Sequence, residues 1–318
     1  MTPPPPPWGG FRKRDALRLD PALDDAELAG VRDALTQGRW AETRELLAGT
    51  GQDWDRRGHR LVVLGREPTS AAWAEEWRLA EPDSVDAAAL HACARVFHAL
   101  RGKEDPGSAR AACRAAARMY PADPTPWLAL LILVRHTGTD EERLQVFDQV
   151  RGRHREHHHA HHLMAASLAE SRQADRDDPF HEVYDFASWA AEQAGAGSPL
   201  SALPVVAHTE RYRALARAGV EPPDPARSGH WKSRRARQVM KAAFDCWLEW
   251  GCEEHPRRLV DLNFLAHAKY HEGRPWEAAA LFHRIGRHVT RAPWCYPDLD
   301  PRAAYRAAHT AATGADLR

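Results

Sequence analysis

Helix-starting signals recur along almost the whole chain, and they restrict its fold more than any other feature. A residue able to cap a helix stands directly before a proline at Asp105-Pro106, Asp123-Pro124, Thr125-Pro126, Asp178-Pro179, Ser198-Pro199 and Asp300-Pro301. The capping oxygen accepts from a free N–H group at the helix start, and proline is tolerated at the first helical position because no hydrogen bond is lost there. The pattern predicts many separate helices.

Apolar residues between these signals recur at spacings of three and four, as in Leu259, Leu262, Leu265 and Ala266. That spacing is typical of one buried face of a helix. No stretch shows the sustained polar-apolar alternation of a half-buried strand. The sequence therefore predicts an all-α fold of about twelve to fourteen helices joined by short turns.

Two similar segments indicate a repeat. They are EPDSVDAAALHACARVF from Glu81 and YPADPTPWLALLILV from Tyr120, and their prolines Pro82 and Pro121 stand 39 residues apart. A period of roughly 34 to 40 residues is typical of stacked helix pairs. We expect antiparallel helix hairpins stacked into an α-solenoid that divides into two halves.

The segment 262–286 reads LNFLAHAKYHEGRPWEAAALFHRIG. It resembles the tetratricopeptide repeat (TPR), in which two helices meet at a glycine turn, here Gly273. The resemblance makes Ala278 the small residue that allows close helix approach and Phe282 the large residue that fills the groove between pairs. Residues 29–47 are a weaker match with Gly38 at the turn, and amphipathic helices of an ordinary bundle remain the alternative.

A TPR array typically holds a peptide in its concave groove, so the resemblance implies a protein or peptide partner. Inward polar residues of the clearest unit, Asn263, His267 and Tyr270, become the candidate contacts. Fold alone does not establish this function.

Composition changes divide the chain into four regions. We expect a disordered, proline-rich tail at 1–23, a helical-repeat region at 24–172, a polar linker at 173–180 and a second helical region at 181–318. The proline- and glycine-rich stretch 219–229 predicts an exposed loop before a long helix.

Charge and cysteine usage exclude several classes of protein. The 44 basic and 44 acidic side chains cancel, which removes the electrostatic attraction of a dedicated nucleic-acid or anionic-membrane binder. No apolar run approaches the roughly 18 residues of a membrane span, and no secretory signal is evident. Five scattered cysteines without a CxxC pair are typical of free buried thiols in the cytoplasm. Abundant Arg and Ala with a single Asn indicate a high-GC genome, as in actinomycetes.

A histidine cluster, HREHHHAHH at 154–162, holds six of the 19 histidines of the chain. In a helix, the pairs His154/His158, His157/His161 and His158/His162 would each share a face and bind Zn²⁺, Ni²⁺ or Cu²⁺ together. The candidate ligands are His157, His158, His161 and His162. The zincin pattern HExxH is missing, and a solvated polar helix start is the alternative interpretation.

One segment, 230–241, concentrates basic residues, and at helical spacing Arg234, Arg237 and Lys241 share a face. This face could contact phosphate groups or an acidic peptide. Phosphate-binding loops, dinucleotide fingerprints and nucleophile elbows are missing from the sequence, so we predict no catalytic residue and no organic cofactor.

Twelve tryptophans are many for this length. We expect Trp40, Trp127, Trp247 and Trp276 to pack between helices, because they lie within apolar periodicities. Trp8 and Trp294 lie outside helical patterns and are the candidates for exposed contacts.

The sequence thus favours a cytoplasmic helical-repeat scaffold that binds another protein. The alternative is a metal-binding protein, sensor or enzyme centred on residues 154–162. A regulator that touches nucleic acid through residues 230–241 is the third hypothesis, and a membrane partner is not expected.

Overall fold

The computed structural model describes residues 17–170, 181–195, 197–250 and 255–314. Within this part of the chain the fold consists of fifteen α-helices and three short 3-10 helices, with no strand. The prediction of an all-α fold is confirmed. The proposed linker, Trp8 and Cys252 fall outside the described residues.

The α-helices are α1 (Ala26–Thr36), α2 (Ala41–Thr50), α3 (Trp54–Gly65), α4 (Ser70–Ala80), α5 (Val85–Leu100), α6 (Pro106–Met119), α7 (Thr125–Thr137), α8 (Asp140–Arg151), α9 (His158–Ala169), α10 (Glu182–Gln193), α11 (Leu203–Arg217), α12 (Arg234–Trp250), α13 (Arg258–Glu272), α14 (Pro275–Ile285) and α15 (Pro301–Thr313). The 3-10 helices are η1 (Pro199–Ala202), η2 (Pro225–Arg227) and η3 (His230–Lys232). None of the helices described here has the length and apolar character needed to cross a membrane.

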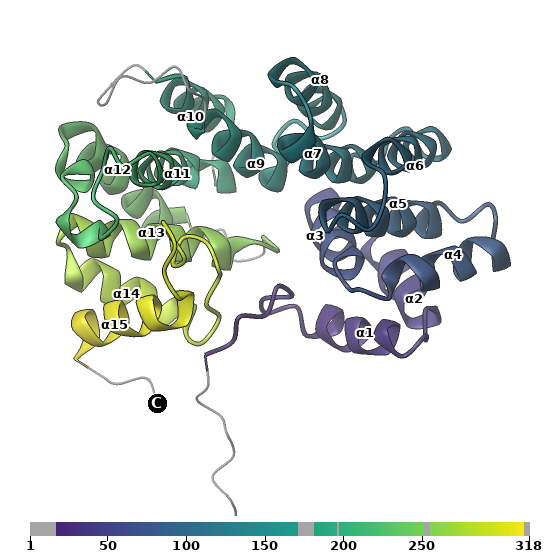
Figure 1. Ribbon diagram of the computed structural model, residues 1–318. Helices are drawn as coiled ribbons and strands as arrows, with labels where there is room; N and C mark the ends of the chain where they lie inside the picture. The colour runs from purple at the N-terminus through teal and green to yellow at the C-terminus, as the bar shows by residue number, and fades with distance from the viewer. Residues whose placement is uncertain (1–16, 171–180, 196, 251–254, 315–318) are drawn as a thin grey trace, which may run out of the picture.

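The helices stack as a curved series of neighbouring pairs (Figure 1). The odd-numbered helices α3, α5, α7, α9, α11 and α13 each contact the next member of that row. Even-numbered helices pack on the odd-numbered helices beside them, as α6 does on α5 and α7. The expected stack of helix hairpins is confirmed as a solenoid-like arrangement.

The chain before α1 ties the start of the series to its end. Leu17 is buried in the apolar cluster of the C-terminal helices. The Arg18 N–H donates to the Arg287 carbonyl at 2.8 Å, and the Val289 N–H donates to the Arg18 carbonyl at 3.1 Å. Residues 17–23 are therefore packed, and do not belong to the tail to which the sequence pattern assigned them.

The predicted capping residues and the predicted glycine turn lie at helix ends in the structure. Asp105 and Asp300 cap α6 and α15, each accepting from a backbone N–H in the first turn. Gly273 ends α13 with φ 86°, a left-handed conformation that glycine adopts without steric cost. Ala278 and Phe282, on the facing helix α14, are fully buried, as the repeat resemblance implied.

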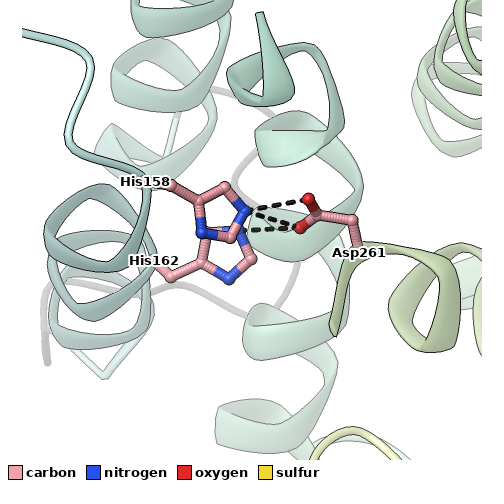
Figure 2. A group of neighbouring side chains, drawn as sticks. All are labelled: His158, His162 and Asp261. Carbon is pink, nitrogen blue, oxygen red and sulfur yellow. Dashed lines mark hydrogen bonds and ion pairs between the residues drawn. The ribbon is translucent and has the colours of Figure 1, made fainter. Parts of the chain in front are cut away.

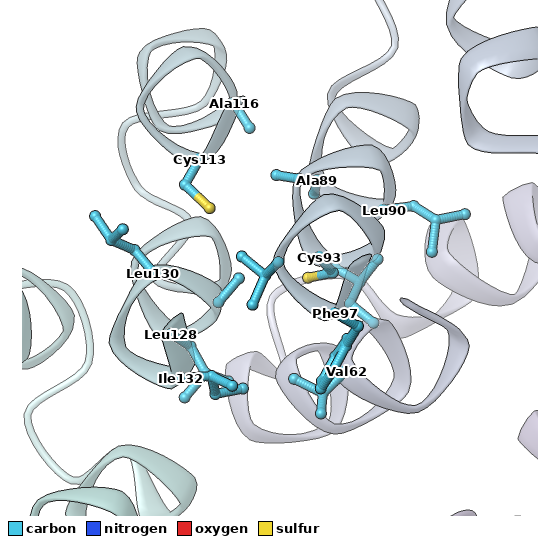
Figure 3. Close-up of a cluster of buried hydrophobic side chains, with 14 of the residues drawn as sticks. Val62, Ala89, Leu90, Cys93, Phe97, Cys113, Ala116, Leu128, Leu130 and Ile132 are labelled. Carbon is cyan, nitrogen blue, oxygen red and sulfur yellow. The ribbon is translucent and has the colours of Figure 1, made fainter. Parts of the chain in front are cut away.

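Close helix approach shapes the N-terminal core (Figure 3). A Cβ atom at Gly65 of α3 would lie 2.7 Å from the Cβ of Cys93 on α5, so a larger residue there would push these helices apart. Cys93 and Cys113 are buried free thiols, as expected, whereas Cys246 and Cys295 are only partly buried.

Two tryptophan predictions are wrong. Trp294, expected to be exposed, is buried at 1% exposure, and its indole N–H donates to Asn263 Oδ1 at 2.7 Å. Trp276, expected to pack between helices, is 84% exposed near the start of α14. Periodicity identifies a helix face but does not show whether a neighbour covers it.

Arg57 of α3 forms the most enclosed ion-pair network of the N-terminal helices. Its guanidinium lies 2.8 Å from Asp123 and 2.7 Å from Asp86, and the side chains of Arg57 and Asp123 are 4% and 2% exposed. Asp123 also accepts from the Thr125 N–H at 2.7 Å, at the start of α7. One guanidinium thus joins α3, α5 and α7.

Replacing Arg57 with alanine is expected to lower the free energy of unfolding by about 3–5 kcal/mol, because two carboxylates then lose their buried partner. The matched control is Arg39→Ala, which removes an exposed pair with Glu42 at 2.9 Å and should cost at most about 1 kcal/mol. Urea denaturation of both variants measures the difference. Equal losses would contradict a role for this network in joining the helices.

Candidate metal centre

The histidine cluster lies in the middle of the helical series, and this position buries it. Helix α9 begins at His158, with His157 as its cap residue. The side chains of His157, His158, His161 and His162 are all buried, because α9 packs against helices on both sides, including α7 and α11. The interpretation of the cluster as a solvated helix start is therefore wrong.

Of the three predicted pairs, His158/His162 meets on one face. Their ring centroids are 4.1 Å apart. His161 points elsewhere: its Nδ1 contacts the His157 carbonyl at 2.9 Å, and its ring packs against Phe147. His154 lies in the turn before the helix, so it does not share a helical face with His158.

A carboxylate completes the group. Asp261 in the first turn of α13 points at both imidazoles (Figure 2). His158 Nε2 lies 2.9 Å from each carboxylate oxygen, and His162 Nε2 lies 3.1 Å from Oδ1. The candidate ligand atoms of the three residues lie within 4.8 Å of one another. Sequence reasoning found the two histidines but missed Asp261, which is about a hundred residues away and has no local motif.

A second carboxylate, Asp55 of α3, supports the cluster from the other side. It accepts from the backbone N–H of His158 at 2.9 Å and contacts His154 Nε2 at 2.8 Å. An acceptor at the first N–H groups of a helix stabilises the helix and orients its first turn. Asp55 therefore holds the turn that presents His158 and His162.

A further imidazole, His255, stands beside the group. Its ring centroid lies 4.5 Å from that of His158. Its buried Nε2 faces the Asp55 carboxylate at 3.7 Å, and its Nδ1 accepts from the Arg257 N–H at 3.2 Å. His255 therefore stands next to the candidate ligands but is already paired with Asp55.

The protonation states suit metal binding. Burial lowers the pKa of His158 far below its usual value and that of His157 to about 4, so both rings are neutral at neutral pH. Burial alone would raise the pKa of Asp261, but its contacts with His158 and His162 hold it below the usual range. A neutral imidazole still donates its N–H to an ionised carboxylate. The lowered pKa of His158 is therefore compatible with the lowered pKa of Asp261. Metal ligands need these deprotonated forms.

The three side chains lie at hydrogen-bonding distance of one another, with their candidate ligand atoms within 4.8 Å. Zinc binds histidine nitrogen and carboxylate oxygen at about 2.0–2.2 Å, which puts neighbouring ligands of a tetrahedral site about 3.3 Å apart. The contacts of 2.9–3.1 Å to Asp261 are a few tenths of an ångström shorter. Small side-chain rotations would bring the donors to coordination distance.

The predicted partner residues occupy different settings. Asn263 is buried, with its amide bonded to the Leu259 and His288 carbonyls and its oxygen to Thr290 and Trp294. His267 is buried against Trp231 and Trp294. These two side chains hold internal segments together and are not open to a partner, although the repeat resemblance had made them candidate contacts.

The remaining candidates are more accessible. Tyr270 is partly buried, whereas Arg234 and Arg237 are exposed on the first turns of α12. The structure therefore leaves the basic face of 230–241 open to solvent. Whether it binds phosphate or an acidic peptide stays a prediction.

The chain matches no family model, no curated protein and no solved structure. The assignment of the site accordingly rests on its own residues and contacts. The helices are consistent with a helical-repeat fold, while the narrower TPR resemblance stays a prediction.

Two histidines near the site should respond oppositely to pH. Burial lowers the pKa of His59 to about 3, so between pH 6.5 and 3 the unfolded chain binds a proton that the folded chain does not. Stability from His59 is present above pH 6.5 and declines on acidification by about 1.4 kcal/mol per pH unit. His59→Gln should therefore flatten the fall in unfolding free energy from pH 7 to pH 5.

His154 provides the contrasting variant, because its hydrogen bond to Asp55 raises its pKa. Its contribution is present below pH 6.5 and lost as pH rises through the folded-state pKa. His154→Gln should destabilise the protein more at pH 5.5 than at pH 8, as urea titrations at both pH values would show. The same pH dependence in both variants would contradict these assignments.

Proposed function

We propose that this protein binds a divalent transition-metal ion, zinc foremost, through His158, His162 and Asp261. The observation that carries the proposal is the meeting of two buried imidazoles with a partly buried carboxylate from a distant part of the chain. A neutral His158 imidazole and an ionised Asp261 carboxylate bind a metal ion with no net loss of a proton, once the His158 ring proton shifts from Nε2 to Nδ1, which favours metal affinity near neutral pH.

The type of ligand narrows the choice of metal. Two imidazoles and one carboxylate suit zinc, and the same set with open positions suits other first-row ions such as nickel. Three protein ligands with a free fourth position are typical of catalytic zinc sites, whereas four ligands are typical of structural ones. Coordination by His255 would give the closed, structural form.

Metal binding would also join parts of the fold. His158 and His162 belong to α9, and Asp261 belongs to α13. An ion held by both helices binds the folded chain and not the unfolded one, so it raises stability by mass action. We therefore expect metal to tie the middle of the helical series to its C-terminal part.

The protein-binding scaffold remains our alternative proposal, in a cytoplasmic, TPR-like protein of a high-GC actinomycete. The glycine turn between α13 and α14 and the exposed Trp276 support it, because exposed tryptophan is favoured at interfaces. A nucleic-acid contact through Arg234 and Arg237 is the third possibility, and the cancelling charges of the whole chain argue against it.

Zinc binding is tested by competition titration and elemental analysis of the purified, untagged protein. We expect one zinc per chain, with His162→Gln and Asp261→Asn each weakening the affinity by more than the roughly 10- to 100-fold typical of losing an outer hydrogen-bond partner. The control is His283→Gln, which alters an exposed histidine of α14 and should leave the affinity unchanged.

Thermal unfolding gives an independent measurement. Zinc should raise the melting temperature of the unaltered chain and of the His283→Gln variant, but not that of His162→Gln. Equal zinc affinity in His162→Gln and His283→Gln would exclude this site and favour the scaffold proposal.

A further inference from the structure

A cavity of about 490 Å³ lies beside the candidate metal centre. Its wall combines the chain before α1, the end of α3, His159 of α9, the start of α13 and the segment after α14. Its volume falls within the range typical of small-molecule pockets, about 300–1,000 Å³. The cavity is therefore large enough to hold a small-molecule ligand.

Three arginines, Arg66, Arg257 and Arg291, line this cavity. None of them forms an ion pair with a carboxylate in the part of the chain that the structure describes. Arg66 places its guanidinium over the Phe97 ring at 5.2 Å, and the buried Nε of Arg257 has no hydrogen-bond partner. The one carboxylate in the wall, Asp20, is already bonded to Arg32 at 2.5 and 3.1 Å.

Three of the buried arginines of this protein each have two carboxylate partners: Asp86 and Asp123 for Arg57, Asp25 and Glu27 for Arg60, Glu170 and Glu210 for Arg213. A charge away from water is costly unless it is paired. Arg257 is half-buried at this cavity without an ion-pair partner, and the exposed Arg66 and Arg291 bring two more positive charges to the same wall, which favours an external anion as the partner.

The electrostatics of the wall agree with this geometry. Burial is the main cause that lowers the pKa of Arg257 to about 10; the charge of Asp261 opposes this shift and the charge of Arg66 adds to it. Burial, followed by the charge of Arg257, lowers the pKa of His59 to about 3. The His59 imidazole therefore stays neutral beside charged guanidinium groups, so it is available to hydrogen-bond a ligand without adding positive charge.

We propose that this cavity binds a small phosphate monoester, with the phosphate at Arg66 and Arg257 and an apolar body against Val62 and Val260. Guanidinium groups match phosphate oxygens in bidentate geometry. A phosphate monoester carries close to two negative charges near neutral pH, so it compensates more of the three cations than a carboxylate does. The apolar wall residues exclude water from the rest of the ligand.

The cavity and the metal centre are neighbours in the chain. His159 follows the candidate ligand His158, and Arg257 precedes Asp261 by about one helical turn. The inference nevertheless rests on the cavity alone. Ligand binding by the cavity is tested with metal-free protein in EDTA. A failure of the cavity to bind its ligand can then be told apart from a failure of the protein to bind zinc.

Calorimetric titration of the full chain with phenyl phosphate tests the proposal, with benzoate as the carboxylate probe. We expect saturable binding of phenyl phosphate that is tighter than binding of benzoate. Arg66→Gln and Arg257→Gln should each weaken it about tenfold or more. The matched control, Arg118→Gln, removes an exposed arginine of α6 away from the cavity wall and should leave it unchanged.

Stability provides a second readout that a purely structural arginine would not give. Without ligand, Arg257→Gln should melt at or above the temperature of the unaltered chain, because the substitution removes a half-buried charge that has no ion-pair partner. Absence of saturable binding, equal affinity in Arg257→Gln and Arg118→Gln, or benzoate binding as tight as phenyl phosphate would overturn the proposal.

Discussion

The packing of two partly buried carboxylates against a cluster of imidazoles is the constraint on which the arrangement of the helices depends. Asp55 comes from α3 and Asp261 from α13, and both reach the first turn of α9. Because a buried carboxylate is costly without hydrogen bonds, α9 must sit where both acids meet its histidines. This requirement sets how the N-terminal and C-terminal helices approach each other. A bound cation would satisfy the same groups and strengthen the same junction.

Charge is distributed unevenly through the interior. Arg57, Arg60 and Arg213 are each neutralised by two carboxylates, and they connect helices. The half-buried Arg257 and the exposed Arg66 face a cavity without such partners. A half-buried charge without a partner costs stability, and such groups are typical of functional sites. We therefore place the function of the molecule in the neighbourhood of the histidine cluster and this cavity.

Local chemistry made much of the fold predictable. Capping by Asp105 and Asp300 and the turn at Gly273 depend on neighbouring residues only. The pair His158/His162 followed from helical spacing. Asp261 did not, because nothing near it in the sequence distinguishes it from a surface acid, and only the packing of α13 near α9 brings it to the histidines. Burial of the cluster and of Trp294, and exposure of Trp276, likewise depend on which neighbouring elements cover each face.

X-ray absorption at the zinc edge, recorded on the protein loaded with one equivalent of zinc, tests the central claim most directly. The account predicts an inner shell of nitrogen and oxygen at about 2.0–2.2 Å, with the multiple-scattering signature of at least two imidazoles. That signature should diminish in His162→Gln. A shell of oxygen ligands alone, or an imidazole signature unchanged in that variant, would contradict a metal centre at His158, His162 and Asp261.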